Sequence, residues 1–213
     1  KPFQPPQMLA AVAKLIAQPS EETMKAARAA WLAARVPYQQ TEAYRFGNAI
    51  VDDWEGKLNA WPLGEGLIDY VADSYGTESD DNPLYTANVI ANTSISFGGE
   101  TVDTSKITKE LLADKLHESA DSEANVATGY HAIEFLLWGQ DLNGTGPGSG
   151  ARPASDYDTA NCTHGNCDRR AQYLKTAASL LVDDLKEMVA NWEDDGAARQ
   201  ALRDAGGNGA LSM

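Results

Sequence analysis

The amino-acid sequence predicts an all-α fold, a helical bundle with at least four substantial helices. One stretch places its apolar residues alternately three and four positions apart, which is the seam of a helix packed in a bundle. We find no stretch that alternates apolar and polar residues as a half-buried strand does, so we expect no sheet. The chain has 213 residues, of which 43% are hydrophobic, enough for a buried core. The seam consists of Ala171, Leu174, Ala178, Leu181, Leu185, Met188 and Trp192.

The N-terminal helices are marked by their apolar spacing and by the residues at their ends. Apolar positions from 9 to 16 indicate a first helix. Ser20 is the expected N-cap of a second, whose apolar stripe continues as far as Pro37. A third helix is expected over 38–58, followed by a short helix or turn over 67–75.

The middle of the chain is less regular. Residues 76–104 are polar and show no clear period. Thr108 is the expected cap of a helix that reaches His117. A longer helix is predicted to begin at Asp121 or Ser122 and to end at Trp138, because Gly139 follows it.

Residues 140–167 are rich in Gly and Pro, a composition that predicts an exposed loop. Within it, Cys162 and Cys167 are the only two cysteines of the chain. A zinc ribbon needs a second pair, so a short disulfide loop formed in an oxidising compartment is favoured over metal ligation or free surface thiols. A last short helix is expected over 197–204, and the Gly-rich residues 206–213 are expected to be a connector.

The charge of the chain excludes one class of partner. Seventeen basic residues against thirty-one acidic residues give a net charge of −14. Nucleic-acid affinity depends on Lys and Arg that displace counterions, so nucleic acid is excluded as a main partner. The chain begins at Lys1 and shows no leader pattern, so we expect that a signal peptide has been removed or was never included.

The segment Gly129-Tyr-His-Ala-Ile-Glu134 is the first candidate for chemistry. On a helix, residues i and i+3 lie on one face about 5–6 Å apart, so His131 and Glu134 can ligate one metal ion or share one proton. Gly129 costs a helix up to about 1 kcal/mol relative to Ala, which suggests that another backbone or a ligand approaches closely. The alternative is a buried histidine that is hydrogen-bonded to a neighbour.

A zinc peptidase site fits this segment only in part. The patterns H-E-x-x-H and H-x-x-E-H supply two histidines, whereas Phe135 stands where a second histidine is needed. The remaining histidines, His117 and His164, are both expected at the surface. A site with few imidazoles and many carboxylates suits iron, manganese or calcium as readily as zinc.

Glu42 and Arg45 form a second candidate pair, again at i and i+3. The simpler interpretation is a surface ion pair, which contributes about 0–1 kcal/mol. Asp52, Asp53 and Asp69 are expected on solvated helix faces, although one of them could complete a metal site.

Several segments together resemble the imelysin-like proteins, in particular the bacterial iron-regulated and insulin-cleaving-peptidase-like branch. The most specific is Gly129-Tyr-His-Ala-Ile-Glu-Phe-Leu-Leu-Trp-Gly-Gln-Asp141, and the resemblance runs from about Ala26 to Leu185. The other segments are Glu42-Ala-Tyr-Arg-Phe46, Leu58-Asn-Ala-Trp-Pro62 and Ile68-Asp69.

The resemblance implies a metal-linked function in a protein exported to the bacterial periplasm or outer membrane, where a lipid anchor on the precursor is one option. Carried over residue by residue, it assigns a metal ion, iron or zinc, to His131 and Glu134 with Glu42, and gives Arg45 the role of orienting an anion. Family members are longer and contain a second helical bundle. Residues 1–205 would then be one bundle domain, and 206–213 would lead to the other.

Three functions follow from these observations. The preferred one is metal binding in iron acquisition, with membrane-associated uptake components as further partners. A metallopeptidase is the alternative, in which metal-activated water attacks a peptide and Glu134 acts as base. The third is a non-enzymatic protein that binds an organic ligand or polysaccharide on Trp61, Trp138 and Tyr44, although these aromatics have core-like spacing.

Overall fold

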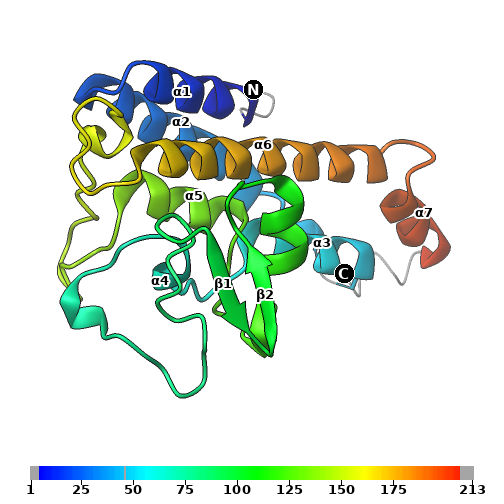
Figure 1. The fold of residues 1–213 in the computed structure, drawn as a ribbon. Helices are drawn as coiled ribbons and strands as arrows, with labels where there is room; N and C mark the ends of the chain where they lie inside the picture. The colour runs from blue at the N-terminus through cyan, green and yellow to red at the C-terminus, as the bar shows by residue number, and fades with distance from the viewer. Residues whose placement is uncertain (1–4, 46, 207–213) are drawn as a thin grey trace.

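In the computed structural model, which describes residues 5–45 and 47–206, helices surround one long central helix (Figure 1). The predicted mostly helical fold is confirmed. Short 3-10 turns and one π-helical segment, Leu111–Leu116, join the longer elements. The α-helices are α1 (Pro5–Ala17), α2 (Glu21–Gln39), α3 (Ala49–Asn59), α4 (Glu65–Ile68), α5 (Gly129–Trp138), α6 (Cys167–Asn191) and α7 (Ala197–Asp204).

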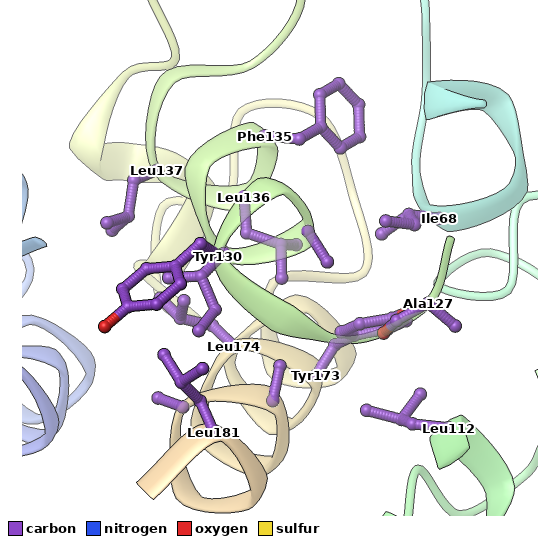
Figure 2. Close-up of a cluster of buried hydrophobic side chains, with 14 of the residues drawn as sticks. Ile68, Leu112, Ala127, Tyr130, Phe135, Leu136, Leu137, Tyr173, Leu174 and Leu181 are labelled. Carbon is purple, nitrogen blue, oxygen red and sulfur yellow. The ribbon is translucent and has the colours of Figure 1, made fainter. Parts of the chain in front are cut away.

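The core lies where α6 meets α1, α3 and α5. Figure 2 shows Tyr130 and Leu136 of α5 beside Leu174 and Leu181 of α6, and all four are fully buried. Each buried side chain of this size contributes about 1.5–3 kcal/mol relative to an exposed one. The predicted seam is therefore correct from Ala171 to Met188, and Trp192 follows the last residue of α6. Because α5 also packs on α2, α3 and α4, only His131, Glu134 and Trp138 of this helix are not buried.

The predicted ends of several helices agree with the structure. Ser20 caps α2, and its side chain and that of Thr23 bond reciprocally to each other's backbone N–H. Thr108 accepts a hydrogen bond from the N–H of Leu111, as its predicted capping role requires. The last helix, α7, spans the predicted residues.

The predicted third helix is wrong at its start. The second helix, α2, does not stop at Pro37 but continues to Gln39, and a 3-10 turn at Glu42–Tyr44 separates it from α3. Thr41 helps to end α2, because its hydroxyl donates to the carbonyl of Tyr38. Gly47, which has a φ of 76°, then redirects the chain before α3 begins.

The helix predicted from Asp121 or Ser122 begins only at Gly129. The intervening backbone forms short local turns and bonds to other segments instead of continuing a helical ladder. The carbonyl of Ala124 accepts from the N–H of Gly64, and Asp121 has a φ of 54°, which a helix does not allow. The bond to Gly64 and the positive φ of Asp121 therefore prevent the helix that the local apolar spacing predicts.

A small antiparallel hairpin contradicts the expectation that no sheet forms. Strand β1 (Ser94–Phe97) pairs with β2 (Glu100–Asp103). Gly98 and Gly99 join the strands with φ values of 58° and 81°, the positive values that a tight hairpin turn requires. The sequence signal for this hairpin was the Gly-Gly pair between two short runs that alternate apolar and polar residues.

The predicted disulfide between Cys162 and Cys167 is present. The surrounding Gly/Pro-rich loop is exposed over residues 141–149 and 159–166, as predicted, but its middle part is not. Arg152, Asp156 and Tyr157 are almost completely buried, so the prediction of an exposed loop is wrong for this part.

Asp69 is also buried, contrary to its predicted place on a solvated face. Its carboxylate accepts two hydrogen bonds from Arg170, at 2.6 and 3.0 Å, and a third from Arg152 at 2.7 Å. The four polar residues Asp69, Arg152, Asp156 and Arg170 form a buried ionic cluster that joins the end of α4, the loop and the start of α6.

Within residues 5–45 and 47–206, no helix is long and apolar enough to cross a membrane. Of the expected connector, residues 207–213 lie outside the described part of the chain.

Candidate metal and ligand site

Gly129 places the start of α5 directly on α3. It has a φ of 80°, and a Cβ atom added there would lie 2.4 Å from the carbonyl oxygen of Leu58. The hydroxyl of Thr128 donates to the carbonyl of the adjacent Lys57 at 3.0 Å. The close backbone approach predicted at Gly129 is thus confirmed. This contact sets the distance between α3 and the first turn of α5.

His131 and Glu134 lie on the face of α5 that the core leaves open. His131 Nδ1 is 3.1 Å from Glu134 Oε2. Because a carboxylate only accepts, Nδ1 carries the proton of this hydrogen bond. The His131 side chain is 18% exposed and that of Glu134 is 44% exposed, so the pair is partly buried but reachable from solvent.

The pair borders a cavity of about 530 Å³, which we call the His131 pocket. Trp61 covers one side of it, with its ring 4.8 Å from the His131 ring, and is itself 68% exposed. Two further carboxylates, Glu65 and Asp141, line the same cavity. Burial raises the pKa of Glu65, although a hydrogen bond from Gln140 and the charge of Arg152 oppose this.

Glu42 and Arg45 form an ion pair with each other and do not line the His131 pocket. Arg45 lines a neighbouring hollow that also contains Trp61. Its guanidinium is 2.9 Å from Glu42 and 3.2 Å from Glu55. Arg45 is therefore surrounded by acidic partners, and its predicted role toward an anion stays a prediction. Phe46 of the same motif lies outside the described residues.

The donors near His131 fit two adjacent positions of a metal ion, one nitrogen and one carboxylate oxygen. A complete protein site needs more. Among the described residues, no three His, Cys, Asp or Glu side chains come together in a way that could hold a metal ion. Glu42, the predicted third ligand, is thus not brought to His131 and Glu134 in a common metal-binding group.

The other two histidines are both occupied by contacts. His117 is mostly buried, with an exposed side-chain fraction of 11%, so its predicted surface position is wrong. His164 is more exposed, but its Nδ1 is 2.6 Å from the buried carboxylate of Asp156, and its ring packs on Tyr70.

Sequence reasoning missed the ionic cluster around Asp69 and the contacts of His117. Arg170 gave a readable signal, because it lies between Cys167 and Leu174 on the buried side of α6 and therefore needs a buried anion. His117 gave none, since its partners, the backbone of Gly56 and Ala127 and the hydroxyl of Thr128, come from other segments of the chain.

The fold and the open face of α5 define a helical domain with a histidine–glutamate pair at an acidic, aromatic-walled pocket. The family model of imelysin, a peptidase family by its designation, matches residues 6–212. The chain belongs to the imelysin family. No curated protein matches it.

Proposed function

We propose that this chain is an exported metal-binding protein that takes up iron as its cargo at His131 and Glu134. The observation that carries the proposal is the adjacency of His131 Nδ1 and Glu134 Oε2, 3.1 Å apart at the mouth of a pocket. The two atoms supply two ligand positions. Water, or oxygen donors that arrive with the iron, would supply the others.

The charge of the pocket supports a cationic cargo. Glu65, Glu134 and Asp141 line it, and its described lining includes neither Lys nor Arg. Carboxylates in a partly closed pocket attract a cation by Coulomb forces that water screens less than at an open surface. The disulfide supports an oxidising location, which we take to be the periplasm or the outer membrane.

The proposal is tested by calorimetric titration of ferrous ion, without oxygen, and of ferric citrate into wild type, His131→Ala and Glu134→Gln. Each variant is expected to bind at least about tenfold more weakly, since each removes one ligand. Asp53→Asn, an exposed carboxylate on α3, is the control and binds as wild type does. Equal binding by all four proteins would refute the assignment.

A second candidate is an organic ligand that stacks on Trp61. The support is the 68% exposure of this indole beside the His131 ring, together with Trp138 in the same lining. Tyr44, also predicted to stack, lines a separate hollow beside the C-terminal part of α6. Trp61→Ala should then abolish ligand binding, whereas metal affinity should change little.

A metallopeptidase is less well supported. Such a site uses three protein ligands and one bound water, whereas the described residues near His131 bring together two. Cleavage of an unfolded peptide that requires metal and is lost in both His131→Ala and Glu134→Gln would replace the binding proposal with this one.

A further inference from the structure

His117 lies beneath the start of α5, at the point where three segments meet. Its Nε2 is 3.2 Å from the carbonyl oxygen of Gly56 in α3. Its Nδ1 is 3.3 Å from the N–H of Ala127 and 3.2 Å from the hydroxyl of Thr128. The imidazole thus bridges α3 and the two residues that precede Gly129.

These contacts fix the tautomer of the imidazole. A backbone N–H only donates, so Nδ1 must be unprotonated to accept from Ala127. The carbonyl of Gly56 only accepts, so Nε2 carries the proton. Both bonds together require neutral His117. A protonated Nδ1 could donate to the hydroxyl of Thr128, but it could not accept from Ala127.

We propose that His117 is a positioning residue for the His131–Glu134 site: neutral, it holds the start of α5 on α3, and protonated, it releases Ala127. This inference rests on the proposed function, because that function makes His131 and Glu134 a binding site. The contacts of His117 with α3 and with the start of α5 do not depend on it. His131 follows Ala127 by four residues and packs on Trp61, which follows α3. A shift of the start of α5 against α3 therefore moves the two walls of the His131 pocket relative to each other.

Burial, and not the charged surroundings, favours the neutral form of His117. Burial lowers the pKa of His117, and the Glu118 carboxylate, 3.9 Å from Nε2, opposes this. On α3, the neighbouring Glu55 and Lys57 are engaged by Arg45 and Glu187. The segment before α5 presents Ala127 and Thr128, which carry no charge.

Two variants of His117 separate the effect of its hydrogen bonds from the effect of its protonation. Asn has its amide near the position of Nδ1, so His117→Asn keeps a neutral acceptor for Ala127 and does not titrate. His117→Leu removes both hydrogen bonds and keeps much of the volume. If His117→Leu fails to fold, His117→Asn still tests the proposal.

The experiment is an NMR pH titration of the metal-free protein from about pH 8 to pH 5, a window around the usual histidine pKa. Since the chain has three histidines, each ring can be assigned by substitution. In wild type, the Ala127 and Gly129 amides and the His131 ring should show an inflection at the midpoint of His117. In His117→Asn that inflection should vanish from all three signals.

Identical titrations of these signals in wild type and His117→Asn would overturn the proposal. A second measurement is the affinity for ferrous ion at a pH above the His117 midpoint, where His117 is neutral. There, His117→Leu should bind the ion about fivefold more weakly than wild type, and His117→Asn should bind it nearly as wild type does. Because the NMR readout uses no metal, it distinguishes failure of this inference from failure of the metal-binding proposal.

Discussion

At the scale of single residues, Gly129 and Leu58 set the separation of α5 and α3. The positive φ of Gly129 excludes a larger side chain, and so does the Leu58 carbonyl oxygen, which would lie only 2.4 Å from a Cβ atom at this position. The histidine–glutamate pair, which begins two residues further along, therefore depends on a backbone contact that no other residue type allows.

Gly129→Ala should lower the free energy of unfolding by about 2 kcal/mol or more, through strain in the left-handed region and collision with Leu58. Urea unfolding measures this. Gly56→Ala is the matched control, since a Cβ at this position of α3 meets no atom within 4 Å. It should be neutral or stabilising by up to about 1 kcal/mol. Equal effects of the two substitutions would contradict the account.

His117 predicts how stability depends on pH. Its pKa is lower in the folded chain than in the unfolded chain, so the unfolded chain binds more protons as the pH falls. The stability that neutral His117 contributes is present above the unfolded pKa of about 6.5 and is lost as the pH falls through the folded pKa.

Wild type should therefore lose more stability than His117→Asn when the pH falls from about 7.5 to about 5, a range that spans the usual histidine pKa. Urea unfolding at the two pH values measures the difference. A wild type and a variant that lose stability in parallel would show that His117 is not the titrating group.

At the scale of elements, the ionic cluster joins α4, the long loop and α6. Although burial alone would raise the pKa of Asp156, hydrogen bonds from Tyr70 and His164 and the charges of Arg170 and Arg152 hold that pKa below its usual value. The cluster thus keeps both carboxylates paired inside the protein, behind the wall of the His131 pocket formed by Phe135.

Asp69→Asn should lower the free energy of unfolding by about 3–5 kcal/mol, because two buried guanidinium groups lose their shared charged partner. Asp52→Asn is the control. Its carboxylate is 3.7 Å from Arg45 at the surface, and its loss should cost at most about 1 kcal/mol. A small effect of Asp69→Asn in thermal or urea unfolding would mean that the cluster does not stabilise the fold.

The elements show what the sequence could and could not predict. In α1, α2, α6 and α7 the apolar spacing is a property of the local sequence, and the helices predicted from it agree with those in the structure. The start of α5 could not be found this way, because residues before Gly129 bond to Gly64 and His117. The same holds for the site: the spacing of His131 and Glu134 is a local property, whereas the neighbours Trp61, Glu65 and Asp141 arrive from elsewhere in the fold.

At the scale of the whole molecule, the disulfide fixes the loop to the start of α6. It closes a short ring that contains His164, which bonds to Asp156 of the ionic cluster. Of the 31 acidic residues, Glu65, Glu134 and Asp141 line the His131 pocket, while Arg152 and Arg170 are buried in the ionic cluster.

The double variant Cys162→Ser/Cys167→Ser should lower the free energy of unfolding by about 2 kcal/mol, the chain-entropy value for so short a ring. The same loss should appear when wild type is treated with a thiol reductant, and the double variant should not respond to it. A reductant that leaves wild-type stability unchanged would show that the bond does not constrain the loop.

The central claim is that a cation binds at His131 and Glu134, and site-resolved NMR tests it most directly. Zn²⁺, which is diamagnetic, is titrated into the protein while the three histidine rings are observed. We predict a saturable shift of the His131 ring at the lowest ion concentrations, unchanged His117 and His164 rings, and loss of the effect in Glu134→Gln. A His131 ring that does not respond, or a first response at His164, would contradict the claim.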